Sequence, residues 1–105
     1  MEDEIAVEEW NRQTVMLMQA MLGAISPNFR MATIENEEGV WVLRFYIEEG
    51  CVEDIDEIDG IGFEFSVLHD SEFRFKQETV ITKDQLTWPD SAVRVVYKRR
   101  ESWLA

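Results

Sequence analysis

Residues 40–48, VWVLRFYIE, alternate large apolar residues with other residues over nine positions. Successive side chains of a β-strand point to opposite faces, so this pattern is typical of a strand with one apolar face. That face would carry Trp41, Leu43, Phe45 and Ile47. Four large apolar side chains need a second layer to cover them, which predicts a sheet with a layer packed against it.

Residues 2–22 predict a helix that can supply this layer, because they contain no Gly or Pro and are rich in good helix formers. Gly23 is suited to the C-terminal cap of that helix. An apolar stripe recurs every three or four residues and consists of Trp10, Thr14, Leu17, Met18, Met21 and Leu22. We therefore expect a helix near residues 2–23.

Three further stretches read as strands. Residues 28–36 are joined to residues 40–48 by the turn-like sequence 36–39, so the two should form an antiparallel hairpin. Residues 73–82 and 92–99 follow, separated by KDQLTWPDS, which has the composition of a loop.

Residues 51–69 have two readings. Ile61, Phe63, Phe65 and Val67 alternate with smaller or polar residues, which favours a strand, whereas residues 51, 55, 58, 62, 65 and 68 recur at helical spacing. Gly60 and Gly62 weaken a helix by roughly 1 kcal/mol each. The pattern by itself predicts a helix to residue 59 and leaves residues 60–68 open between helix and strand.

Together these elements predict a single α+β domain spanning residues 1–105. The expected order is α-β-β-α-β-β, with a four-stranded antiparallel sheet and two helices on one face. The hydrophobic share of 46% is too high for a disordered chain even at a net charge of −12.

The charge is concentrated in residues 1–70, which carry 17 acids and three Arg, whereas residues 71–105 carry five acids and seven bases. A field of this sign repels nucleic acid and anionic lipid, so we expect no direct nucleic-acid binding and no membrane binding. There is no apolar run of ~20 residues, and the N-terminus is acidic, which favours a cytoplasmic protein.

The acidic stretch 48–59, EEGCVEDIDEID, holds seven carboxylates and no basic residue, yet it includes Ile55 and Ile58. This composition predicts an amphipathic helix with an acidic outer face. One reading is a solvated face that keeps the protein soluble; the other is a docking surface for a cationic partner. The candidate partner-binding residues are Glu48, Glu49, Glu53, Asp54, Asp56, Glu57 and Asp59, with Trp88 in the loop as a possible aromatic anchor.

The sequence offers little for catalysis or metal binding. His69 and Cys51 are the only residues of their kinds, so a Zn site of His and Cys cannot be assembled. DIDEIDG resembles a Ca²⁺ loop only faintly, because the twelfth position from Asp54 is Phe65 and not Glu. We therefore expect no catalytic residues, no metal and no cofactor.

Four segments carry a family resemblance: ISPNFR (25–30), WVLRFYIEEG (41–50), the acidic stretch 52–59 and VVYKRRE (95–101). In this order they resemble small bacterial toxin-immunity proteins, including those of contact-dependent growth inhibition systems, over about residues 15–101. The resemblance implies a non-enzymatic protein that binds and neutralises a cognate toxin domain, often a nuclease. Because a nuclease must attract phosphate, we expect this toxin domain to be basic. The resemblance also implies one continuous acidic helix over residues 52–69.

Two functions are therefore in competition. The first is an immunity protein that blocks a toxin by one-to-one binding, with charge steering the encounter and a few buried anchors supplying affinity. The alternative is another acidic protein-binding adaptor, or a mimic of nucleic acid, without catalytic activity. The identity of the gene product encoded next to this chain would separate them.

Overall fold

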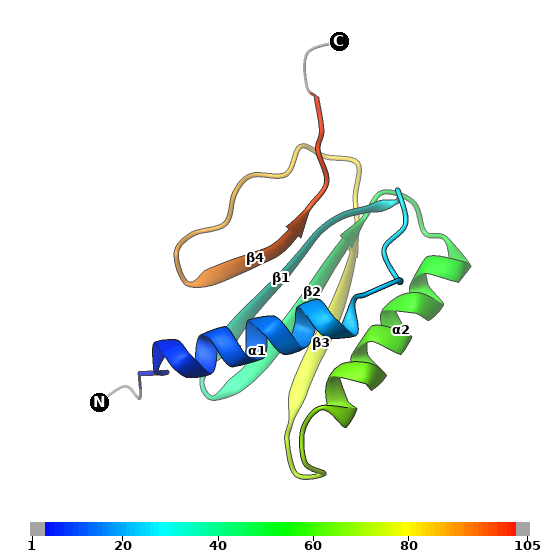
Figure 1. Ribbon diagram of the computed structural model, residues 1–105. Helices are drawn as coiled ribbons and strands as arrows, with labels where there is room; N and C mark the ends of the chain where they lie inside the picture. Colours follow the sequence, from blue (N-terminus) through cyan, green and yellow to red (C-terminus); the bar gives the residue numbers. More distant parts are fainter. Residues whose placement is uncertain (1–3, 103–105) are drawn as a thin grey trace.

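The computed structural model of the chain describes residues 4–102. Its elements are α1 (Val7–Ala20), β1 (Phe29–Glu37), β2 (Val40–Ile47), α2 (Val52–Val67), β3 (Phe75–Ile81) and β4 (Val93–Lys98) (Figure 1). The order is the predicted α-β-β-α-β-β. The first helix begins later than expected, and residues 2 and 3 of the predicted helix lie outside the described residues.

The hairpin of β1 and β2 is antiparallel, as predicted, with Ile34 opposite Leu43. Its two-residue turn consists of Glu38 at φ 54° and Gly39 at φ 91°. Positive φ at both positions matches the right-handed twist of the flanking strands. The side-chain oxygen of Asn36 accepts a hydrogen bond from the Gly39 N–H at 2.9 Å and holds the turn.

The strands lie in the order β3-β2-β1-β4, and the prediction of an all-antiparallel sheet was wrong at one pair. β4 pairs antiparallel with β1, but β3 pairs parallel with β2. The reason is α2, which carries the chain back along the sheet before it re-enters beside β2, so β3 must run in the direction of β2. A strand pattern predicts that a strand exists and does not give its direction.

The core lies between the helices and the sheet. All four side chains expected on the buried face of β2 are buried there, in one cluster with Leu17 and Met21 of α1 and Ile58 and Phe65 of α2. The expected placement of both helices on one face is matched in part: α1 crosses in front of the strands, and α2 runs beside β3 (Figure 1). The fold is thus α+β, with two helices packed against a mixed four-stranded sheet.

The buried face of α1 differs from the predicted stripe. Met18 and Leu22 point to solvent, with exposed fractions of 51% and 78%, whereas the polar Gln13 is completely buried. Gln13 can be buried because its side chain is hydrogen-bonded: its amide donates to Glu9 at 2.8 Å, and its oxygen lies 2.8 Å from His69 Nε2. A buried face predicted only from the spacing of apolar residues does not include such a buried polar residue.

Residues 60–68, left open by the pattern, continue α2 as a helix to Val67. Ile58, Ile61 and Phe65 are buried at helical spacing, whereas Phe63 and Val67 face solvent. The alternation in residues 61–67 was therefore the wrong guide, and the continuous helix implied by the family resemblance is confirmed to within two residues of each expected end.

Candidate functional site

The outer surface of α2 is strongly acidic. The helix contains six carboxylates and no Lys or Arg. Two of them, Glu53 and Asp54, lie in the first turn, where the positive end of the helix dipole stabilises negative charge. Five are exposed to solvent and form what we call the acidic face: Glu53, Asp56, Glu57, Asp59 and Glu64.

The acidic face has no ion-pair partner within residues 4–102. Seven of the ten Lys and Arg residues form ion pairs in that range, and all of these pairs are with carboxylates outside α2. Carboxylates three and four residues apart on a helix repel one another by a few tenths of a kcal/mol, as Glu53 does with Asp56 and Glu57. No cation of the described part of the chain forms an ion pair that relieves this repulsion.

Asp54, which was expected to bind the partner, instead forms a hydrogen bond inside the fold. It is buried and accepts a hydrogen bond from the side-chain amide of Asn28 at 2.9 Å. The same amide donates to the Glu49 carbonyl at 2.9 Å, and the Asn28 oxygen accepts from the Glu49 N–H at 2.8 Å. Asn28 thus ties the start of α2 to the segment that leads into β1.

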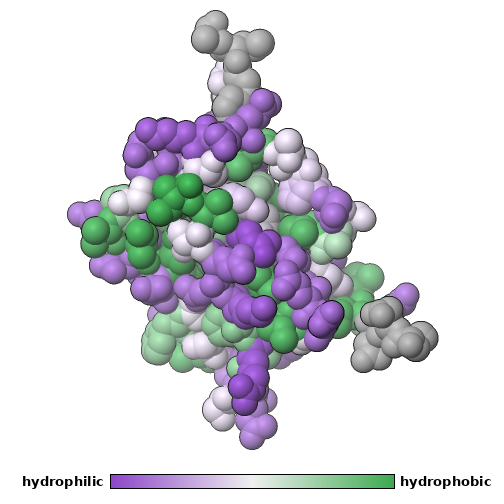
Figure 2. Space-filling view, turned by 180° about the vertical axis from the view of Figure 1, so that it is seen from behind, coloured by the Kyte–Doolittle hydropathy of each residue, from purple (hydrophilic) through white to green (hydrophobic). Residues whose placement is uncertain are grey.

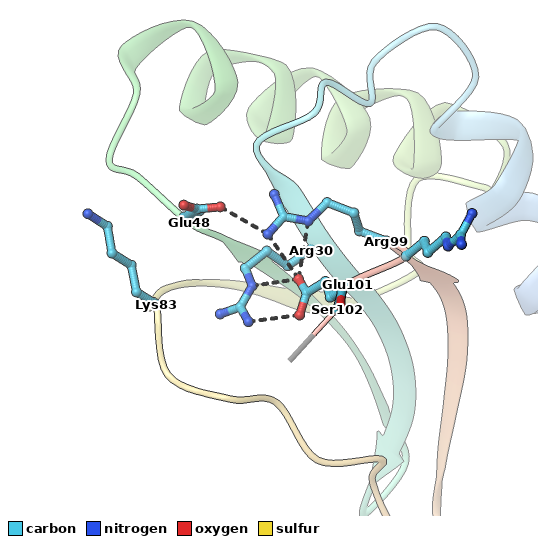
Figure 3. A pocket seen from close by; sticks show the side chains of 7 residues that line it. Arg30, Glu48, Lys83, Arg99, Glu101 and Ser102 are labelled. Carbon is cyan, nitrogen blue, oxygen red and sulfur yellow. Dashed lines mark hydrogen bonds and ion pairs between the residues drawn. The ribbon is translucent and has the colours of Figure 1, made fainter. Parts of the chain in front are cut away.

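Glu48 and Glu49 lie before α2 and are neutralised within the chain. Glu48 accepts a hydrogen bond from Arg99 at 2.9 Å, and Glu49 forms an ion pair with Lys83 at 2.9 Å. Glu48 borders a charged hollow in which Arg30, Arg99 and Glu101 point toward one another (Figure 3). The structure therefore separates these two acids from the unpaired acidic face.

The charged hollow is an internal ion network. Nε and Nη2 of Arg30 donate to the two oxygens of Glu101 at 2.8 and 3.0 Å, and Nη1 donates to the carbonyls of Thr82 and Asp84 at 2.8 and 2.9 Å. The hydrogen bond from Arg30 lowers the pKa of Glu101 to about 2. Arg30, Arg99 and Lys83 already have anionic partners, so the hollow is a weak candidate for binding a ligand.

Trp88, the expected aromatic anchor, lies in the connection of residues 82–92 between β3 and β4 and is 69% exposed. Those two strands occupy opposite edges of the sheet, so the connection crosses from the β3 edge to the β4 edge (Figure 1). Trp88 is available for a partner, and it belongs to a different segment from the helix that carries the acidic face.

His69 has a packing role. Its ring stacks on Phe73 with centroids 3.7 Å apart, and its nitrogens lie 2.8 Å from the Phe65 carbonyl and the Gln13 oxygen. These contacts join the end of α2 to α1. Among residues 4–102, no three His, Cys, Asp or Glu side chains gather so as to hold a metal ion, and no helix is long and apolar enough to cross a membrane.

Sequence reasoning missed one group of exposed residues on α2. Val52, Ile55, Phe63 and Val67 are apolar side chains at the surface of the helix, beside or between the carboxylates. A helical projection of residues 52–67 would have found them, but the strand reading assigned Phe63 and Val67 to the core.

The matched family decides among the functional classes. The model of the MafI2 immunity protein family matches residues 11–101, which include the whole of α2, the four strands and Glu101. The chain belongs to this family. The predicted resemblance to bacterial toxin-immunity proteins is thereby confirmed, and MafI2 membership indicates a toxin-neutralising function. No match was found among curated proteins.

Proposed function

We propose that this MafI2 immunity protein binds a cognate basic toxin domain, a nuclease, and neutralises it one-to-one by covering its active site. The observation that carries the proposal is the unpaired acidic face of α2. Because a nuclease must attract phosphate, its cleft is basic, and a surface with five exposed carboxylates can be steered to that cleft. The protein would act without catalysis, cofactor or metal, in the cytoplasm of the cell that makes it.

The distribution of charge favours docking over mere solubility. Solubility needs only a net charge, and any arrangement of the surplus acids would provide it. Here seven of the ten bases are paired with acids outside α2, for example Arg44 with Glu35 at 2.7 Å and Glu78 at 2.8 Å. Five exposed carboxylates gather on one helix, where they meet no cation within residues 4–102.

The first test reverses four charges: Glu53→Lys, Asp56→Lys, Glu57→Lys and Asp59→Lys in one variant. The probe is the toxin domain encoded by the gene that adjoins the gene of this chain. We expect association at 0.1 M salt to slow at least tenfold, since loss of steering acts on the association rate. Nucleic-acid cleavage by the toxin should end at one equivalent of wild-type protein and persist at one equivalent of the variant.

A matched control carries the same change in net charge at exposed acids outside α2: Glu4→Lys, Glu8→Lys, Glu38→Lys and Glu72→Lys. This control should associate within about threefold of wild type. Equal association rates for both variants would refute docking through α2. A toxin domain that cuts no nucleic acid would refute the nuclease assignment alone.

A further inference from the structure

Exposed apolar side chains form a strip along the side of the molecule where α2 and β3 lie. The strip consists of Val52, Ile55, Phe63 and Val67 of α2 with Ile81 of β3. Phe63 is 65% exposed and Val52 is 71% exposed. Seen from behind, apolar residues gather on this side, whereas the middle of the sheet is hydrophilic (Figure 2).

The apolar strip has no role in the core. The buried side of α2 is filled by Ile58, Ile61 and Phe65. Gly62 marks the side that faces β3, because the Gln77 side chain of β3 reaches the helix at Gly62 and lies 3.4 Å from the Ile58 carbonyl. The strip lies outside this contact, so exposing it costs free energy that the fold does not recover.

Carboxylates are interleaved with the strip. Asp56 lies one helical turn after Val52, and Asp59 lies one turn after Ile55 and one turn before Phe63. On the other side of the helix, Glu57 and Glu64 border a hollow against the end of α1. An apolar centre with charged neighbours is the usual arrangement of an interface in which a few anchors carry the affinity.

We propose that the apolar strip, with Phe63 as its largest side chain, is the anchor of the toxin interface. This inference rests on the proposed function and identifies which side chains hold the partner once charge has steered it. The occupant would be a toxin surface with an apolar depression rimmed by Lys or Arg. A second copy of this chain, with net charge −12, would bring like charges together along the same surface.

The two parts of the interface should have different kinetic signatures. Long-range charge acts on association, whereas the contacts of a buried anchor act on dissociation. Phe63→Ser should therefore speed dissociation from the adjoining-gene toxin domain by about 30-fold, the scale of a strong hot spot, and leave association within about threefold. Val52→Ser should show a smaller change of the same kind.

The control variants remove equally exposed apolar side chains from α1. Val15 and Met18 are 58% and 51% exposed and lie outside the strip. Val15→Ser and Met18→Ser should bind within twofold of wild type. All variants are first compared with wild type in chemical unfolding, so a change in folding is separated from a change in binding.

The outcomes separate this inference from the proposed function. If the charge-reversed α2 variant associates slowly but Phe63→Ser dissociates like wild type, the anchor is not this strip and the proposed function stands. If wild type itself does not bind the toxin domain, the proposed function fails first. Two results would also overturn the anchor: a larger loss in Trp88→Ser than in Phe63→Ser, or a wild-type dimer that Phe63→Ser abolishes without any change in toxin affinity.

Discussion

At the scale of single residues, Arg30 joins three segments of the chain. Its side chain is almost fully buried, and a buried guanidinium is strongly unfavourable unless its charge and donors are satisfied. Glu101 supplies the charge, and the carbonyls of Thr82 and Asp84 accept the remaining hydrogen bonds. One side chain thus fixes β1, the start of the connection to β4 and the segment after β4.

Glu101→Gln should lower the free energy of unfolding at pH 7 by roughly 3 kcal/mol, the lower end of the cost of breaking a buried ion pair. Glu101 has its pKa lowered from 4.5 to about 2, so its contribution is complete above pH 4.5 and is lost as pH falls toward 2. Chemical unfolding at several pH values should show the difference from wild type shrinking over that window.

The control for this pH dependence is Glu72→Gln, at an exposed carboxylate that forms no ion pair within residues 4–102. Its stability should follow that of wild type at every pH. A Glu101→Gln variant as stable as wild type at pH 7 would show that the pair with Arg30 does not stabilise the fold.

At the scale of elements, the sequence predicts where the helices and strands lie better than how they are connected in space. The alternation in residues 40–48 and the turn after Asn36 are local signals, and both predicted the hairpin correctly. The direction of β3 depends on where α2 returns the chain, which no local pattern records. Periodicity alone therefore could not predict that the sheet is mixed.

The sequence predicted that the candidate site is acidic, but not which of its carboxylates are exposed and unpaired. The surplus of acids in residues 48–59 pointed to α2, but burial of Asp54 depends on Asn28, 26 residues earlier. Glu48 likewise meets Arg99, 51 residues later. Such pairings between distant segments decide which carboxylates stay free, and a single sequence does not show them.

The two glycines of α2 differ in a way that the structure explains. A side chain at Gly60 would meet nothing, whereas one at Gly62 would collide with the end of the Gln77 side chain. Gly60→Ala should raise the free energy of unfolding by up to about 1 kcal/mol through helix propensity. Gly62→Ala should gain less or lose stability, because Gln77 must move from its place beside the Ile58 carbonyl.

Urea unfolding in a Gln77→Ala background distinguishes the causes. Without the Gln77 side chain, Gly62→Ala should stabilise about as much as Gly60→Ala. Equal effects of the two substitutions in the otherwise unchanged protein would mean that Gln77 does not restrict the helix surface.

At the scale of the whole molecule, positive and negative charges are separated. Most cations lie on the sheet or next to it, and seven of the ten form ion pairs, whereas five exposed carboxylates without an ion-pair partner in residues 4–102 lie together on α2. A basic partner therefore meets a concentration of unpaired negative charge at α2. This separation orients the encounter before any contact is made.

Raising the salt concentration should slow association with the toxin domain, because the screening length falls from about 10 Å at 0.1 M to about 3 Å at 1 M. Dissociation should change little, since apolar contacts are not screened. Stopped-flow association measured across this range provides the test, with the charge-reversed α2 variant as the control whose association salt should no longer slow. A wild-type rate that does not vary with salt would leave the acidic face a solubilising feature only.

The ion pair between Arg30 and Glu101 joins residues 71 positions apart, and this separation has a consequence for synthesis on the ribosome. β1 lies between β2 and β4, so until β4 is made, one edge of β1 has no strand to pair with. Arg30 lacks its carboxylate over the same interval. A nascent chain that reaches only residue 92 therefore lacks both β4 and Glu101. The four-stranded sheet can be completed only late in translation.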